Sequence, residues 1–273
     1  MKKTRLRSYA KLIAKMGCNV QKGQDVFLTC GIEQPDFTAM VVDELYKAGA
    51  RKVFVDMSYQ PLEKIHVRGR SVKSLGTVES FEEEKLKYMA EKLPIRLFLT
   101  SEDPDGLKGM NTAKLVKGQQ ARYPIVKPYR DAIEGKHQWC IAGVPGAAWA
   151  KKVFPGEPKG RAIEKLWEAI LHTARVDDDP VAAWEAHNKD LRDRCAYLNS
   201  LGIDTLEYNS SNGTHLTVGM IPEARFAGGC DTTDQDVSYN PNTHRRVLHL
   251  PHEGQGRGHR LLLQAPELSG PAH

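Results

Sequence analysis

The 273-residue sequence lacks any apolar run that approaches the ~18 residues of a membrane-spanning helix. Its first 17 residues are basic, and Lys11 and Lys15 interrupt their apolar positions. This pattern predicts a helix and not the core of a signal peptide. The sequence therefore excludes an integral membrane protein and gives no support for export. We expect a cytoplasmic protein with no membrane partner.

Cysteine is scarce, and no two cysteines form a C-x-x-C pair. The five cysteines are odd in number and far apart, at Cys18, Cys30, Cys140, Cys195 and Cys230. This spacing argues against a disulfide framework and against a thiolate metal site. It predicts reduced thiols buried in the protein.

Several catalytic motifs are also absent, namely H-E-x-x-H, G-x-S-x-G and G-x-x-x-x-G-K-[ST]. The run GQGRGH at 254–259 has some likeness to a phosphate loop, but no strand leads into it. The net charge of the chain is also small. The net charge is +5 for the chain and +3 for residues 1–242, because the last 31 residues hold four Arg and two Glu. This balance does not indicate a nucleic-acid partner.

The sequence does contain short apolar runs that alternate with amphipathic segments. The runs are DVFLTC (25–30), KVFVD (52–56), IRLFLT (95–100) and QWCIA (138–142). They are too short for helices, and their near-continuous apolarity predicts strands buried on both faces. The amphipathic segments predict helices at 34–50, 80–93, 160–176 and 177–202. The alternation predicts an α/β fold: a parallel sheet with helices on both faces.

Capping residues mark the ends of these helices. Gly49 stands where the first helix needs a left-handed C-terminal cap. Ser80 and Glu83 have the spacing of a capping box at the start of the second helix. Asp179 and Pro180 predict the start of the fourth helix.

From residue 204 the sequence changes to short alternating stretches and turns, which predicts a β hairpin. We therefore expect three regions along the chain. Residues 1–202 form the N-terminal α/β domain, and residues 203–242 begin a second, β-rich domain. Residues 243–273 form an aberrant tail without apolar periodicity, which we expect to be disordered.

Polar residues follow the predicted strands, where ligands bind in open α/β sheets. They include Asp56, the GVPG run at 143–146, and an acidic loop with Glu102, Asp103 and Asp105. The acidic loop has the residue types to ligate a metal or hold an amine, but Asp-Pro-Asp-Gly is also an ordinary turn, which we favour. The histidines without a partner at ligand spacing are His66, His137, His172 and His187. We assign no catalytic, cofactor-binding or metal-ligating residue.

Several longer blocks carry a resemblance to a known family. They include NVQKGQDVF (19–27), SEDPDGLKGMN (101–111), DDPVAAWEAHNKDL (178–191) and GTHLTVGMIPEARFAGG (213–229). These blocks resemble the thermophilic metallo-aminopeptidase family, which includes aminopeptidases T, S and II. The resemblance runs almost continuously from about residue 5 to Asn242.

The resemblance implies an N-terminal α/β domain followed by a metal-binding catalytic domain, which begins at 203–242. In the full-length family, that domain holds two divalent metal ions, zinc or cobalt. The family removes N-terminal residues from peptide substrates and forms a homodimer. It usually has Asp in the place of His215, which is not a metal ligand. The family's ligands come after the position of Asn242, so none is assigned here and we expect this chain to bind no metal.

The tail at 243–273 differs in composition from the rest. It holds five of the ten histidines and no Lys, whereas residues 1–242 hold 22 Lys. One permitted set of codons for the tail, read one base later, encodes a peptide close to the family's continuation. This favours a frameshift after Asn242. A histidine metal site and a basic binding arm stay open, although Pro251 disfavours helical ligand spacing. The residues in question are His244, His249, His252, His259 and Glu253.

The sequence thus indicates a metallo-aminopeptidase by resemblance, with metal-assisted hydrolysis as the reaction of the full-length family. We expect this chain to be inactive, because no metal ligand is assigned to it. The alternative, from another class of protein, is a non-catalytic α/β binding or dimerisation module.

Overall fold

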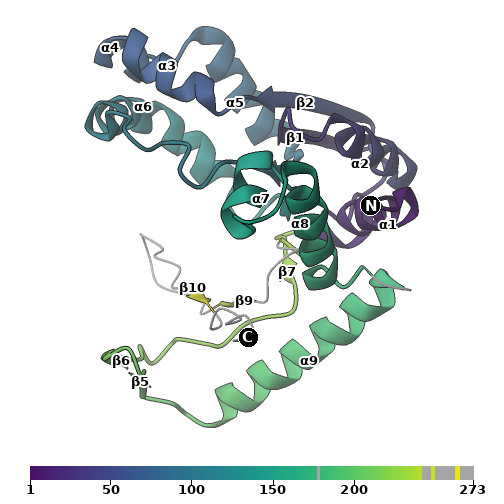
Figure 1. Cartoon of the computed structure of the whole chain (residues 1–273). Coiled ribbons are helices and arrows are strands. Elements are labelled where there is room, and N and C mark those ends of the chain that lie inside the picture. The colour runs from purple at the N-terminus through teal and green to yellow at the C-terminus, as the bar shows by residue number, and fades with distance from the viewer. Residues whose placement is uncertain (177–178, 242–246, 250–261, 265–273) are drawn as a thin grey trace. The chain divides into compact units, whose positions relative to one another are not determined.

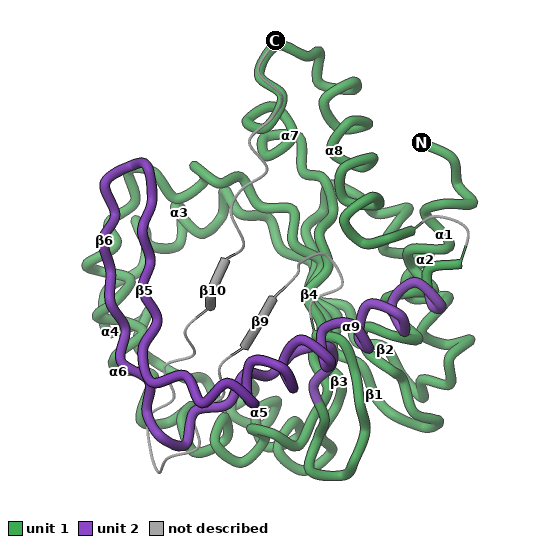
Figure 2. The backbone as a smooth tube through the Cα atoms, turned by 90° about the horizontal axis from the view of Figure 1, so that it is seen from below, with its two compact units in different colours: residues 1–180, 232–244 green, residues 181–231, 245–273 purple. Residues whose placement is uncertain are grey.

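The computed structural model of the chain describes residues 1–176, 179–241, 247–249 and 262–264. These residues form two compact units, shown in different colours in Figure 2. The first unit contains residues 1–180 and 232–244, and the second contains residues 181–231 and 245–273.

The first unit is built on a four-stranded parallel sheet with the strand order β2-β1-β3-β4. Strands β1 and β2 of this sheet are labelled in Figure 1. The strands are β1 (Asp25–Gly31), β2 (Lys52–Ser58), β3 (Ile95–Thr100) and β4 (Trp139–Gly143). In the register, Leu28 of β1 lies opposite Val55 of β2 and Leu97 of β3. All four predicted strands and their parallel arrangement are confirmed.

Helices connect the strands and cover the sheet. They are α1 (Lys3–Leu12), α2 (Pro35–Ala48), α3 (Pro61–Gly69), α4 (Val72–Gly76), α5 (Ser80–Lys92), α6 (Thr112–Ile133), α7 (Ala147–Val153) and α8 (Lys159–Thr173), with a π-helical turn η1 (Ile13–Gly17). The chain moves in one direction from β1 to β2 and in the other from β2 to β3 and β4. Right-handed crossovers therefore place α2 on one face and α5 and α6 on the other. The predicted fold class is confirmed.

One face of the sheet is buried along β1, β3 and β4. Val26 and Leu28 of β1 are inaccessible to solvent. The ring of Tyr9 is also inaccessible, and Phe37 is only 2% exposed. The Tyr9 and Phe37 rings stack with centroids 5.5 Å apart, and Trp167 of α8 meets Phe37 edge-on at 5.0 Å. Burying such apolar surface contributes about 25 cal/mol per Å². This core fixes α1, α2 and α8 together.

The opposite face is covered only in part. Phe27 of β1 and Phe98 of β3 are half-buried, and every residue of β2 is half-buried or exposed. The expectation that the strands are buried on both faces is therefore wrong. The physical reason is that β2 is an edge strand of the sheet, and residues on both of its faces are only partly covered.

One predicted helix cap is confirmed, and another lies one residue away from its predicted position. Gly49 caps α2 in the left-handed conformation, with φ of 115°, as predicted. The capping box of α5 lies one residue earlier than predicted: the Glu82 carboxylate accepts a hydrogen bond from the backbone N–H of Glu79 (2.9 Å). Glutamates at 79 and 82 have the same spacing as Ser80 and Glu83, so the spacing alone did not decide between them.

Residues 232–241 return to the first unit. The Asn240 N–H donates to the Met16 carbonyl (2.9 Å), and the Ile141 N–H of β4 donates to the Pro241 carbonyl (2.8 Å). The short strands here are β7 (Asp231–Thr232) and β8 (Ser238–Tyr239). The two compact units therefore do not begin and end where the expected regions 1–202 and 203–242 do. The assignment of residues 203–242 to the start of a catalytic domain stays a prediction.

The second unit contains α9 (Pro180–Ser200) and an antiparallel hairpin of β5 (Thr205–Asn209) and β6 (His215–Gly219). The predicted hairpin is confirmed. β9 (Val247–His249) and β10 (Leu262–Gln264) form another antiparallel pair. Of the tail residues singled out above, His244, His252, Glu253 and His259 lie outside the described residues, and so does most of the tail.

Candidate functional site

The carboxyl ends of the four parallel strands meet at one edge of the sheet, where α/β folds bind ligands. The loops at this edge are residues 31–34, 58–60, 101–106 and 143–146. The loops after β1 and β3 are joined by a hydrogen bond from Ser101 Oγ to Glu33 Oε2 (2.9 Å). The chain reverses its direction of travel across the sheet between these strands, so this is the topological switch point.

Glycine is required at position 146, where two of these loops approach each other. A Cβ at Gly146 would lie 1.9 Å from the Ser101 carbonyl oxygen, and one at Gly31 would lie 2.4 Å from Ser101 Oγ. Both distances are far below a van der Waals contact. The GVPG run therefore serves close packing between strand-end loops.

The acidic loop after β3 has the contacts of a turn. The Asp103 N–H donates to Gln60 Oε1 (2.8 Å), and the Asp103 carboxylate accepts from the Asp105 N–H (2.9 Å). The Asp105 carboxylate pairs with Lys152 of α7 (2.7 Å). Glu102 is exposed. These contacts fit the turn interpretation, since the carboxylates of Asp103 and Asp105 face partners of their own.

The four histidines singled out in the sequence have different surroundings. His66 and His172 are exposed on helices. His137 Nδ1 lies 2.8 Å from the Ile133 carbonyl oxygen, and burial lowers the pKa of this imidazole. His187 is buried edge-on against Trp184, with centroids 5.6 Å apart. In the part of the chain that the structure describes, no group of three His, Cys, Asp or Glu side chains is placed to hold a metal ion.

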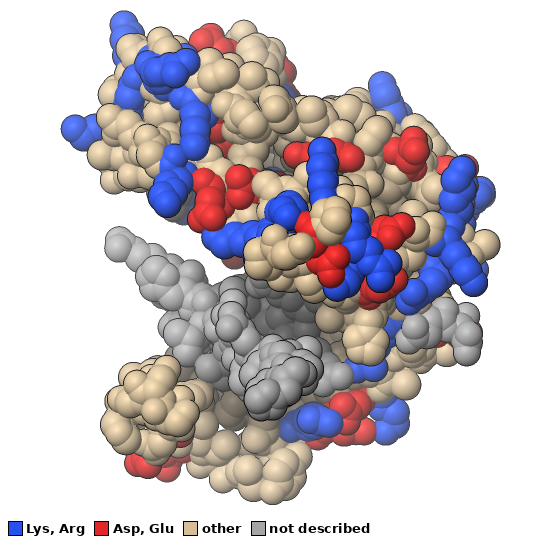
Figure 3. Space-filling view, in the orientation of Figure 1, with Lys and Arg blue, Asp and Glu red and all other residues tan. Residues whose placement is uncertain are grey.

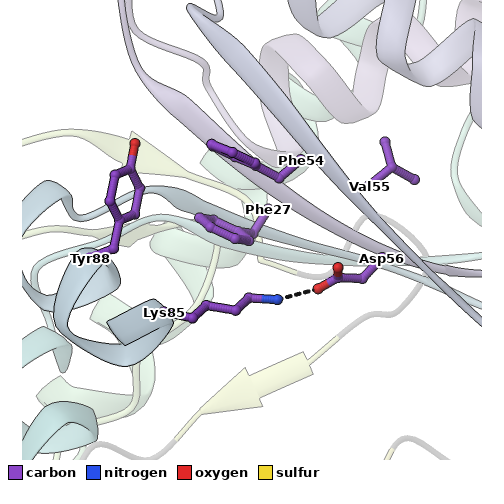
Figure 4. Close-up of a pocket in the computed structure, with 6 residues that line it drawn as sticks. All are labelled: Phe27, Phe54, Val55, Asp56, Lys85 and Tyr88. Carbon is purple, nitrogen blue, oxygen red and sulfur yellow. Dashed lines mark hydrogen bonds and ion pairs between the residues drawn. The ribbon is translucent and has the colours of Figure 1, made fainter. Parts of the chain in front are cut away.

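The sequence missed an open pocket on the half-covered face of the sheet. This aromatic pocket has a volume of about 400 Å³ and is lined by Phe27, Phe54, Val55, Asp56, Lys85 and Tyr88 (Figure 4). The rings of Phe27 and Phe54 stack with centroids 4.7 Å apart. Asp56, which the sequence singled out, forms an ion pair with Lys85 of α5. The available signal was that Phe recurs in two adjacent strands.

A buried carboxylate fixes the position of Tyr88 in this pocket. Asp25, at the start of β1, accepts hydrogen bonds from the Tyr88 hydroxyl and the Arg51 guanidinium. Burial acts to raise the pKa of Asp25, but these two hydrogen bonds outweigh it and hold the pKa below its usual value. The hydrogen bond to Asp25, together with burial, raises the pKa of Tyr88. The tyrosine therefore stays neutral and donates to a carboxylate that stays charged.

Ion pairs also cover the surface of the first unit. Arg122 of α6 pairs with Glu82 of α5 (2.7 Å), and Lys47 of α2 pairs with Asp43 (2.8 Å). On the face drawn in Figure 3, Lys and Arg side chains are interspersed with Asp and Glu. None of the described helices is long and apolar enough to cross a membrane.

Comparison with known proteins places the chain in a family. The family model of the thermophilic metalloproteases (M29) matches residues 2–259. Aminopeptidase T of Thermus thermophilus is 32% identical over 259 residues, which cover 94% of this chain and 63% of that protein. Aminopeptidase AmpS of Bacillus subtilis is 30% identical over 251 residues, which cover 91% of this chain and 59% of that protein.

The solved structure of wild-type AmpT from Thermus thermophilus has the same fold. It superposes with a TM-score of 0.80 at 31% identity and covers 91% of this chain and 61% of that chain. The chain thus spans about three fifths of the length of the curated relatives it matches. The family match extends to residue 259, so the expectation that the resemblance stops at Asn242 is wrong. The chain belongs to the thermophilic metalloprotease family M29.

Proposed function

We propose that the chain supplies the α/β domain of a metal-dependent aminopeptidase, a hydrolase that removes N-terminal residues from peptides. The observation that carries this proposal is membership of the M29 family over nearly the whole chain. We further propose that the full-length protein works in the cytoplasm as a homodimer on peptide substrates.

The described residues do not fit the two divalent metal ions, zinc or cobalt, that this function implies. A two-metal site needs several carboxylate and imidazole ligands within a few Å of each other. Among the described residues, no such group of side chains is found. In the acidic loop after β3, the Asp103 carboxylate closes a turn and the Asp105 carboxylate pairs with Lys152. We therefore propose that this chain by itself is inactive.

In this proposal the residues of the first unit have a supporting role. Hydrogen bonds join the strand-end loops: Ser101 Oγ donates to Glu33 Oε2, and Gln34 Nε2 donates to the Pro145 carbonyl (3.0 Å). These bonds, with the glycines that allow close approach, hold the carboxyl edge of the sheet in one arrangement. Such an edge is a firm base for loops that bind a substrate.

A second candidate function is a non-catalytic α/β binding or dimerisation module. One observation favours it: large apolar side chains of the first unit are exposed, among them Met57 of β2, Phe81 of α5 and Tyr123 of α6. Where such side chains form a contiguous patch, they mark an interaction site.

The test is an assay with leucyl peptides in the presence of zinc or cobalt, with aminopeptidase T of Thermus thermophilus as the positive control. We expect the purified 273-residue chain to release no amino acid above background and to contain no stoichiometric pair of metal ions by elemental analysis. Turnover that Glu102→Ala or Asp103→Ala abolishes would contradict the proposal and place the metal at the acidic loop. Light scattering after size exclusion tests the second candidate.

A further inference from the structure

The lining residues of the aromatic pocket combine an apolar wall with one charge of each sign, and Lys52 Nζ lies 4.6 Å from the centroid of the Phe54 ring. Its wall is formed by Phe27 and Phe54, which stack with an interplanar angle of 12°, and by Tyr88, which meets both rings edge-on at 6.1 and 6.0 Å. The charged groups, Lys85 and Asp56, pair with each other at its rim (Figure 4). The volume of about 400 Å³ lies in the range of small-molecule sites.

The wall is rigid enough to act as a preformed surface. Phe27 and Phe54 project from adjacent strands and lie directly opposite each other in the register. Tyr88 is held by its hydrogen bond to the buried Asp25. A ligand that covers these half-buried rings removes apolar surface from water without reordering the wall.

The ion pair of Lys85 and Asp56 is exposed enough for the two groups to separate and pair with charged groups of a ligand. The side chains of Lys85 and Asp56 are 43% and 55% exposed. Ion pairs at such exposure contribute little to stability, so separating the two groups is inexpensive. Lys85 Nζ also lies 5.0 Å from the centroid of the Phe27 ring, so the cation stands next to the apolar wall.

We propose that this pocket binds a free amino acid with an apolar side chain. The ammonium group of the ligand pairs with Asp56, its carboxylate pairs with Lys85, and its side chain covers the rings of Phe27, Phe54 and Tyr88. Only a free amino acid carries an ammonium and a carboxylate on a single carbon, which matches a Lys and an Asp close enough to pair with each other. A longer peptide separates these two charges.

Isothermal titration calorimetry on the 273-residue chain tests the proposal, with L-leucine and L-phenylalanine as probes. We expect both to bind with a dissociation constant on the order of 1 mM. Glycine lacks the apolar side chain, N-acetyl-leucine lacks the ammonium charge, and leucinamide lacks the carboxylate. Each of these three is expected to bind about tenfold more weakly or worse.

Two variants locate the site. Asp56→Asn removes the partner of the ammonium group and should weaken leucine binding at least about tenfold. The matched control is Glu84→Gln, since Glu84 also pairs with a lysine of α5 (Lys87, 2.7 Å) but does not line the pocket. This control should bind leucine as the parent chain does. Both replacements are at exposed side chains, so folding is expected to persist, and circular dichroism checks it.

Three results would overturn the proposal: no heat of binding with leucine at tens of millimolar, equal binding of leucine and N-acetyl-leucine, or equal effects of Asp56→Asn and Glu84→Gln. The experiment contains no peptide and no metal ion. Its outcome is therefore independent of the proposed peptidase function, which stands or falls by the leucyl-peptide assay.

Discussion

Replacing Asp25 with Asn is expected to lower the free energy of unfolding of the first unit by about 1–2 kcal/mol at pH 7. Asp25 is only 6% exposed and accepts hydrogen bonds from Arg51 and Tyr88. A hydrogen bond to a charged group contributes about 1.5–3 kcal/mol. The expected loss of free energy is smaller than the contribution of two such bonds. Asn keeps one oxygen acceptor, and the Arg51 side chain, which is 58% exposed, forms hydrogen bonds with water instead.

The effect of this substitution should depend on pH with a definite sign. The pKa of Asp25 is lower in the folded chain than its ordinary value of about 3.9. The stabilisation from the charged carboxylate is therefore fully present above about pH 4 and is lost as the pH falls through the lower folded pKa. The difference between the parent chain and Asp25→Asn should shrink in strong acid.

Urea unfolding at pH 7 and at pH 3 measures both effects. Asp131→Asn is the matched control, because Asp131 pairs with Lys127 on α6 and the two side chains are 53% and 48% exposed. This control should change stability by less than about 0.5 kcal/mol. The reasoning fails if Asp25→Asn behaves like the control, or if its effect is the same at both pH values.

Two further substitutions and one alkylation reaction give predictions that rest on buried contacts. Tyr9→Phe removes a hydrogen bond of 3.2 Å from a fully buried ring to the last carbonyl of β4, and should lower stability by about 1 kcal/mol in thermal unfolding. Gly146→Ala forces a Cβ to 1.9 Å from the Ser101 carbonyl oxygen, and should destabilise by about 2 kcal/mol or more, measured in the same way. With iodoacetamide at pH 8, the half-buried Cys230 should react first by mass spectrometry, while Cys18 stays unmodified, because a hydrogen-bonded neighbouring thiol and burial raise its pKa.

The sheet was predictable because its signal is local. Each strand is a short apolar run bounded by turn residues, and the helix after β1 ends at a glycine that takes the left-handed conformation. Helix α6 was not predicted, because Pro124 and Pro128 lie inside it and proline removes a helical hydrogen bond. Its start carries a cap that could have been noticed: the Asn111 side chain accepts from the Lys114 N–H (2.9 Å).

The aromatic pocket was out of reach of the sequence for a different reason. Phe27 and Phe54 stand inside apolar runs, and such residues are normally core. They form a wall because they are opposite each other in the register and because β2 is the edge of the sheet, which are properties of pairing and not of either run. Lys85 and Tyr88 lie three residues apart on α5, so they share one side of that helix. That spacing becomes informative only once α5 is known to lie over β1 and β2.

The acidic loop shows the opposite case, in which the residue types were clear and their use was not. Asp103 and Asp105 have the chemistry of metal ligands and equally that of turn residues, so composition is consistent with both. Partners decide between the two uses. The Asp103 carboxylate accepts a backbone N–H within its own loop, and the Asp105 carboxylate faces Lys152 on the helix after β4. A divalent ion at this loop would have to displace both partners. A lysine placed against a ligand carboxylate would also repel the ion, so the turn is the use that this loop supports.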